Sequence, residues 1–192
     1  MTPGRSDARM AGAFSPAQQK AALWADPGAR VHAVIDARVV PGLPARLAAA
    51  DLLGWDCLLR GALEPEAAEH APYLVDLREQ SPFTDWLLGE AGTAFPGWGV
   101  LMVSALALLP MRQHCRELSE VMLPDGCQRT WRWFDPQVWE LILPSLSPGQ
   151  LDEVFAPGLS YVVPLPAAWT WHRLDQGLLV STPRVTAAAA AG

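Results

Sequence analysis

Short apolar runs alternate with helical segments over the first two-thirds of the chain, and this alternation constrains the fold more than any other feature. Val31–Asp36 is a β-branched run, and Pro41–Leu53 after it is rich in Ala and Leu. Ala71–Leu77 and Gly99–Val103 are two further apolar runs with the length of buried strands. The turn residues Pro124–Gly126 then indicate a β-hairpin. This order predicts an α/β or α+β fold with a mixed sheet, flanking helices and a β-hairpin, in one compact domain of one or two lobes.

The two ends of the chain differ in composition from its middle. Residues 1–14 are small and polar and predict a disordered leader, whereas residues 183–192 contain an alanine run and predict a low-complexity tail. Between them, Ser15 and Ser147 each begin a capping-box pattern with proline at the first helical position. We therefore expect the folded domain to span residues 15–182.

Composition and charge exclude several classes of protein. Of the 192 residues, 51% are hydrophobic and 18% are charged, which excludes a disordered chain. The net charge of −6 argues against a nucleic-acid binder, which needs a basic face. Three scattered cysteines are too few for a disulfide framework, and no signal peptide is recognisable. The longest uncharged run, Phe95–Met111, is too short and too often interrupted for a membrane span. We expect a cytoplasmic protein that binds neither nucleic acid nor membranes.

No residue pattern of the chain is typical of an enzyme. The sequence contains no phosphate loop and no G-x-S-x-G motif, and His114, Cys115 and Cys127 lack the spacing of zinc ligands. Asp36 and Asp135 each follow an expected strand, where paired acids could bind a divalent metal for hydrolysis. Each also has a structural interpretation, as a turn residue or arginine partner at Asp36 and as a helix N-cap at Asp135. We favour the structural interpretation and expect no catalytic residue, metal ligand or cofactor.

Tryptophan dominates the aromatic residues, with nine Trp beside two Tyr and five Phe. Trp concentrates in protein cores and at interface anchors. The densest cluster is Arg129–Pro136. In a strand, Trp131 and Trp133 would lie on one face, opposite Arg132. That indole face is either core or an interaction surface, and the sequence leaves both open. The candidate partner-binding residues are Trp131, Trp133, Trp169 and Trp171.

Five motifs occur in an order that resembles a known family. They are Val34–Ala37, Ala71–Leu77, Ser104 with His114–Leu118, Pro124–Gly126, and Trp131–Pro136. Over about residues 31–164 this set resembles the effector adaptor, or chaperone, family of the bacterial type VI secretion system, which was first catalogued as a domain of unknown function. Cys115, Trp133 and Gln137 depart from the residues usual in that family. We interpret the motif residues as locking the fold: Asp36, Pro72, Tyr73, Arg132, Asp135 and Pro136.

The resemblance implies a binding protein rather than an enzyme. Members of this family hold a toxic effector in the producing cell and help load it onto the VgrG spike before secretion. We therefore expect an adaptor whose partners are a cognate effector, bound through its N-terminal region, and the VgrG spike, with no cofactor. An apolar groove that accepts a helix would suit this task. Two alternatives stay open: a small metal-dependent hydrolase that uses Asp36 and Asp135, and an immunity protein that binds a toxin domain.

Overall fold

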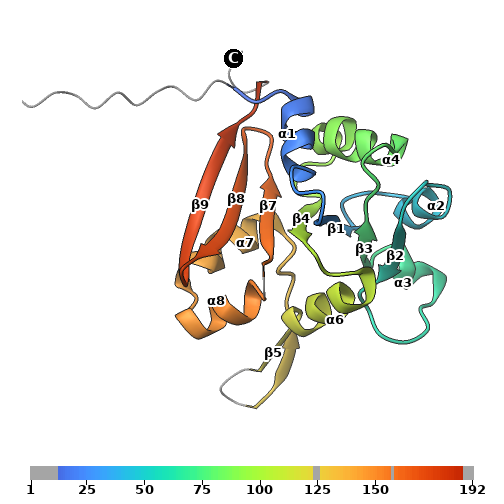
Figure 1. The fold of residues 1–192 in the computed structure, drawn as a ribbon. Helices are drawn as coiled ribbons and strands as arrows, with labels where there is room; N and C mark the ends of the chain where they lie inside the picture. The colour runs from blue at the N-terminus through green and yellow to red at the C-terminus, as the bar shows by residue number, and fades with distance from the viewer. Residues whose placement is uncertain (1–12, 123–125, 157, 188–192) are drawn as a thin grey trace, which may run out of the picture.

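A seven-stranded sheet runs through the middle of the molecule (Figure 1). The computed structural model describes residues 13–122, 126–156 and 158–187. The α+β class predicted from the sequence is confirmed. In spatial order the strands of the sheet are β2 (Gly54–Cys57), β3 (Pro72–Asp76), β1 (Arg30–Asp36), β4 (Gly99–Ser104), β7 (Ser160–Pro164), β8 (Ala168–Asp175) and β9 (Leu178–Val185).

The strand pairings described in this sheet are all antiparallel, whereas the sequence predicted a mixed sheet. The reason lies in the helical crossovers. β1 and β2 run in the same direction and are joined through α2 (Leu43–Ala48), but β3 lies between them. In the same way, β3 and β4 are joined through α4 (Pro82–Trp86) and are separated by β1. The two strands of each such pair therefore run in the same direction, as the alternation predicted. They are not hydrogen-bonded to each other, because another strand lies between them in the sheet.

Helices begin where the sequence places capping residues. Ser15 and Ser147 form complete capping boxes at α1 (Pro16–Leu23) and α8 (Pro148–Val154). Asp135 caps α7 (Pro136–Ile142), because its side chain accepts a hydrogen bond from the Gln137 N–H at 3.0 Å. Other elements are α3 (Pro65–Ala68), the π-helical turn η1 (Leu87–Ala91), α5 (Gly92–Ala94), α6 (Leu108–Leu118), the hairpin strands β5 (Glu120–Met122) and β6 (Gln128–Thr130), and the 3-10 turn η2 (Leu143–Ser145).

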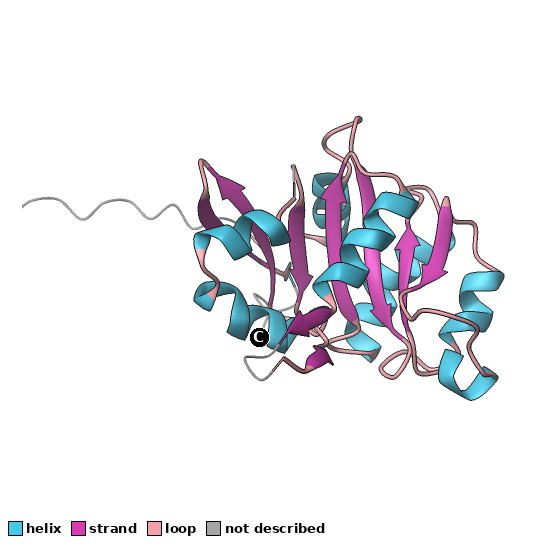
Figure 2. Ribbon diagram, turned by 90° about the horizontal axis from the view of Figure 1, so that it is seen from below, coloured by secondary structure: helices cyan, strands magenta, loops and turns pink. Residues whose placement is uncertain are grey.

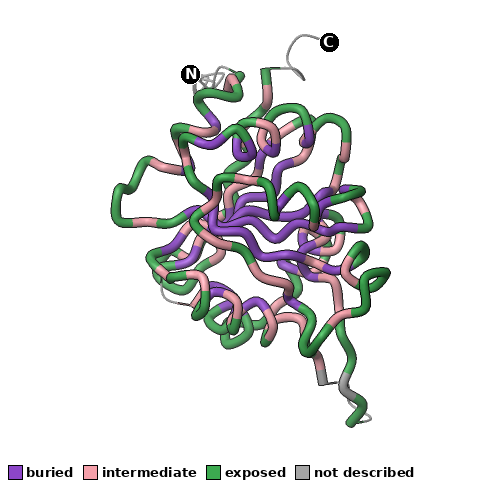
Figure 3. The backbone as a smooth tube through the Cα atoms, turned by 90° about the vertical axis from the view of Figure 1, so that its right-hand side faces the viewer, coloured by how far each residue is buried: buried purple, intermediate pink, exposed green. Residues whose placement is uncertain are grey.

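The sheet separates two hydrophobic cores, and helices cover both of its faces (Figure 2). Along β1, Val31, Ala33 and Ile35 belong to the first core, which also contains the buried residues of α1, α2 and α4. Val34 belongs to the second core, where α6, α7 and α8 pack. This alternation follows from the two-residue period of a strand. The buried parts of the chain gather in the central strands, as Figure 3 shows.

The uncharged run Phe95–Met111 is divided between β4 and α6. Gly99 at the start of β4 has a φ of 154°, and a Cβ there would lie 1.8 Å from the carbonyl oxygen of Val34. Only glycine therefore allows β4 to approach β1 at this point. Across the described ranges, no helix combines the length and the apolar character that crossing a bilayer requires.

The ends of the ordered domain lie slightly outside the boundaries predicted from the sequence. The Phe14 N–H donates to the Val185 carbonyl at 2.9 Å, and the Ala187 N–H donates to the Phe14 carbonyl at 3.0 Å. Phe14 was assigned to the leader, and β9 continues three residues past the expected end at 182. These two backbone hydrogen bonds join Phe14 to the segment that ends in Ala187. Local composition could not predict this contact, because the two segments are far apart in the sequence. Residues 1–12 and 188–192, the rest of the predicted leader and tail, lie outside the described residues.

Candidate functional site

A cavity of about 260 Å³ lies beside the carboxyl end of β1, and we call it the arginine cavity. Its walls come from the turn after β1, the loop after β2, the start of β3, the last turn of α6 and the segment that follows β6. Four arginines line it, together with apolar side chains and two carboxylates. The lining residues are Asp36, Arg38, Leu58, Leu59, Arg60, His70, Pro72, Arg116, Ser119, Glu120, Thr130, Trp131, Arg132 and Phe134.

An ion pair between Asp36 and Arg132 forms one wall of the arginine cavity. Asp36 is 2% exposed at the end of β1, and its Oδ2 accepts a hydrogen bond from the Arg132 guanidinium. Its Oδ1 accepts the Arg38 N–H at 3.0 Å. Asp36 therefore both closes a turn and pairs with an arginine, which are the two structural roles expected from the sequence. The same Arg132 nitrogen lies 3.8 Å from Oδ2 of Asp135, so both acids face one guanidinium.

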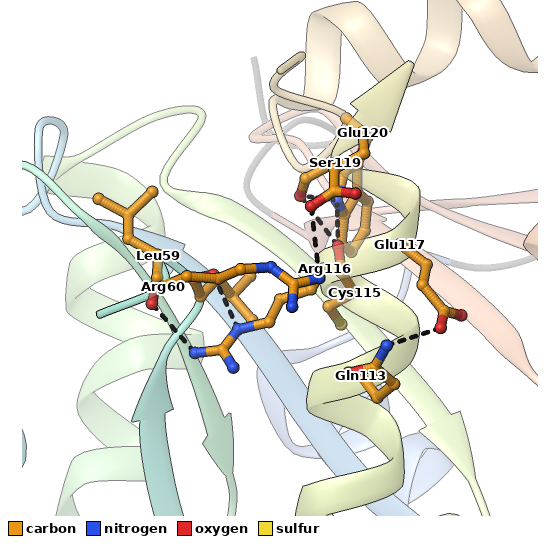
Figure 4. A network of polar contacts seen from close by, with 10 residues as sticks. Leu59, Arg60, Gln113, Cys115, Arg116, Glu117, Ser119 and Glu120 are labelled. Carbon is orange, nitrogen blue, oxygen red and sulfur yellow. Dashed lines mark hydrogen bonds and ion pairs between the residues drawn. The ribbon is translucent and has the colours of Figure 1, made fainter. Parts of the chain in front are cut away.

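Arg116 holds the loop after β2 against the end of α6. Its guanidinium donates to the carbonyl oxygens of Cys57 at 2.8 Å, Leu58 at 3.0 Å and Leu59 at 3.0 Å. Figure 4 shows the contact to Leu59. Three peptide carbonyls accept hydrogen bonds from the Nε and Nη2 donors of Arg116 without neutralising its charge. Arg60, drawn beside it in Figure 4, pairs instead with Glu120 at 3.3 Å.

Apolar side chains complete the cavity. Trp131 is half-buried, and its indole N–H donates to the carbonyl of Leu118 at the end of α6. Phe134 is buried, and the Arg132 guanidinium lies 5.7 Å from its ring centroid. Leu59 remains 38% exposed at the rim. The arginines therefore stand in partly apolar surroundings, where their charges are less screened than in bulk water.

Positive charge exceeds negative charge in the cavity. Asp36 and Glu120 are paired with Arg132 and Arg60, respectively. Within the described part of the chain, no carboxylate pairs with Arg38 or Arg116. The cavity is thus locally positive on a chain whose net charge is −6.

The structure separates Trp131 from Trp133, which were predicted to share one strand face. β6 ends at Thr130, so neither residue lies in a strand. Trp133 is fully buried, with its ring centroid 5.9 Å from that of Trp139 and 6.0 Å from that of Tyr161. Its indole N–H donates to the Cys115 carbonyl at 3.2 Å. Trp133 is therefore a core residue and offers no surface to a partner, which corrects its assignment as partner-binding.

Trp169 and Trp171 lie on β8, away from the arginine cavity. Trp169 is 7% exposed and lines a smaller apolar cavity of about 130 Å³, together with Trp98 and Phe14. Trp171 is half-buried beneath Arg184, whose guanidinium lies 4.7 Å from the ring centroid. Of the four candidate tryptophans, Trp131 is the one placed in the arginine cavity.

Of the remaining motif residues, Pro72 lines the cavity at the start of β3, whereas Tyr73 and Pro136 do not line it. Tyr73 points to the opposite side of the strand, where it is buried in the first core and its hydroxyl donates to the Ala68 carbonyl at 3.0 Å. Pro136 is buried at the start of α7. Arg38, Arg60 and Arg116 were not identified as site residues from the sequence.

The residues considered as metal ligands do not form a metal site. His114 lies 3.1 Å from the Val154 carbonyl and 3.0 Å from the Tyr161 hydroxyl. Cys115 is fully buried beside Met102, and burial raises the pKa of its thiol. Among the residues whose positions are described, no three His, Cys, Asp or Glu side chains are grouped so that they could hold a metal ion.

Comparison with known proteins identifies one family. A family model described as "Domain of unknown function (DUF4123)" matches residues 31–153. No curated protein and no solved structure matches the chain. The matched segment includes every residue that lines the arginine cavity, whereas β7, β8 and β9 lie beyond it.

Proposed function

The chain belongs to the DUF4123 family of domains of unknown function, and on this premise we propose that it is an effector adaptor of a type VI secretion system. It binds a toxic effector in the producing cell and helps load that effector onto the VgrG spike. The action is binding and release, with no chemical turnover and no cofactor. This proposal joins the family match to the order of motifs between Val34 and Pro136.

The arginine cavity is the observation that supports this proposal best. Asp36, Pro72 and Arg132 are motif residues from segments far apart in the sequence, and all three line the same cavity. Trp131 and Leu59 add apolar surface at a partly exposed position. A cavity with apolar walls and a few oriented polar groups is the kind of surface on which a partner's side chains anchor.

The arrangement of Asp36 and Asp135 favours the adaptor over the metal-dependent hydrolase. A divalent cation between these acids would have to displace the Arg132 guanidinium, which already contacts both of them. Asp135 is further committed to capping α7. Each acid thus has a structural partner that accounts for its position.

Co-expression tests the proposal. The tagged chain is produced together with each type VI effector of its own bacterium, and the pairs are purified in the presence and absence of the VgrG spike. The proposal predicts one effector that co-purifies, becomes more soluble and is passed to VgrG. Failure of every effector to bind would contradict it, and binding confined to a toxin domain would support an immunity protein instead.

A further inference from the structure

The arginine cavity contains two arginines whose charges no carboxylate among the described residues balances. Arg116 donates to three backbone carbonyls from Nε and Nη2, and these neutral acceptors leave its positive charge in place. Arg38 is exposed at the rim, and its backbone is fixed by the hydrogen bond from its N–H to Asp36. A guanidinium that extends from a hydrogen-bonded turn and has no carboxylate partner can pair with an incoming anion.

Apolar side chains line the same cavity as these charges. Leu58 and Phe134 are buried in the cavity wall, and Trp131 is half-buried beside them. Charges that meet in such surroundings interact more strongly than they do in water. The cavity therefore suits a ligand that presents a negative charge next to an apolar group.

The size of the cavity and its exposed rim suit side chains of a protein segment. Its volume of about 260 Å³ is below the range of about 300–1,000 Å³ that is typical of small-molecule sites. Its rim, formed by Arg38, Leu59 and His70, is exposed, so a chain could continue past it on the surface.

We propose that the arginine cavity binds an acidic segment of the effector, in which an Asp or Glu side chain lies next to a large apolar residue. The inference rests on the proposed adaptor function and adds the chemistry of the bound segment. The carboxylate pairs with Arg38 at the rim and is attracted by the charge of Arg116. The apolar neighbour packs against Trp131 and Leu58.

Charge reversal at the rim tests this inference. Arg38→Glu replaces the guanidinium by a carboxylate, which would repel the carboxylate of the bound segment. Arg38→Lys keeps the positive charge. The matched control is Arg173→Glu, because Arg173 is an exposed arginine on β8 that does not line the cavity. Thermal unfolding of each variant verifies that the fold is retained. Affinity is measured for the effector that co-purifies with the unmodified chain, and for overlapping synthetic peptides that cover its sequence.

We expect Arg38→Glu to weaken the affinity for the effector about tenfold or more. The affinity of Arg173→Glu should be near that of the unmodified chain, and the affinity of Arg38→Lys should lie between the two. The peptides that bind should contain an acid beside a large apolar residue, and their affinity should fall as salt rises from about 0.05 M to about 0.5 M. Equal affinities for Arg38→Glu and Arg173→Glu, or competition by inorganic phosphate without any peptide binding, would overturn the inference while the adaptor function stands. If no effector binds the unmodified chain, the adaptor function fails, and the inference fails with it.

Discussion

The carboxylate of Asp36, at the end of β1, accepts a hydrogen bond from the guanidinium of Arg132, which lies 96 residues further along the chain. This contact ties β1, an inner strand of the sheet, to the segment that precedes α7. It also places an ion pair in the wall of the arginine cavity. The fold and the proposed binding cavity therefore share this pair of residues.

Loss of the Asp36 carboxylate should destabilise the fold. Asp36→Ala leaves Arg132 without its buried partner and removes the acceptor of the Arg38 N–H, so we expect the free energy of unfolding to fall by about 2–4 kcal/mol. Urea denaturation near neutral pH measures the change. The control is Asp51→Ala, which breaks the exposed Asp51–Arg78 pair and should cost less than about 1 kcal/mol. Equal losses in the two variants would contradict this role of Asp36.

The two neighbouring tryptophans should behave differently. Trp133→Ala opens a cavity among Trp139, Tyr161 and Phe134 and should lower the free energy of unfolding by about 3–5 kcal/mol. Trp131→Ala should cost less stability, because Trp131 is only half-buried, and should reduce effector affinity. Denaturation and binding measurements on both variants separate the two roles. A Trp131→Ala variant with full affinity would remove this residue from the binding surface.

Acid should destabilise the protein through buried histidines. Burial lowers the pKa of His32 to about 4, from about 6.5 in the unfolded chain, although Asp76 lies 3.8 Å away. Between these values the unfolded state binds a proton that the folded state does not, so the free energy of unfolding falls by up to about 3 kcal/mol as the pH drops from about 6.5 to about 4. Burial also lowers the pKa of His114 and His172, which adds to the effect in the same direction.

The check is the pH dependence of the urea midpoint for the unmodified chain and for His32→Gln. Glutamine does not titrate, so the variant should lose less stability than the unmodified chain between about pH 6.5 and about pH 4. If the two proteins lose the same stability over this interval, His32 does not contribute to it.

The three thiols should react in the order of their exposure. Cys127 is exposed, Cys57 is half-buried with a pKa raised by burial, and Cys115 is fully buried with a raised pKa. Because the thiolate is the reactive form, iodoacetamide should modify Cys127 first, Cys57 more slowly and Cys115 only after unfolding. Mass spectrometry of the native and urea-unfolded protein follows each site. Rapid native modification of Cys115 would mean that the second core opens.

The features predictable from the sequence are those whose partners lie within a few residues. Ser15 and Ser147 bond to residues three positions away, and Asp135 bonds to one two positions away, so the three helix starts follow from local patterns. The strand at β1 is likewise a local apolar run. Local chemistry is enough wherever the hydrogen-bond partner is a near neighbour.

The end of β6 shows why other predictions failed. Trp131 and Trp133 were expected to lie in a strand of the hairpin, but α6 ends at Leu118 and the pairing of β5 with β6 starts at Glu120. The Trp131 N–H donates to the Ser119 carbonyl at 3.0 Å, and the residues immediately before Ser119 belong to α6 and not to a strand that could pair with the segment after β6. The length of β6 is limited by the length of β5, the strand with which it pairs. The residues of the segment itself do not indicate where β5 begins.

The binding site required contacts between distant parts of the chain. Arg116 donates to carbonyls of residues that lie 57 to 59 positions earlier in the chain. The residues around Arg116 contain no pattern that predicts this contact. The motif residues Asp36 and Arg132 were identified by resemblance to a family, but their direct pairing became evident only in the fold.

Site-specific photo-crosslinking tests the central claim, that this chain holds an effector in the arginine cavity, most directly. A photoreactive residue is introduced at Leu59, which is 38% exposed at the cavity rim, or at Leu141, which is 78% exposed on α7 and does not line the cavity. Each variant is illuminated in cells that produce the effectors. We expect an effector to be crosslinked at position 59 and none at position 141. Crosslinking at 141 without crosslinking at 59, or no effector at either position, would contradict the central claim.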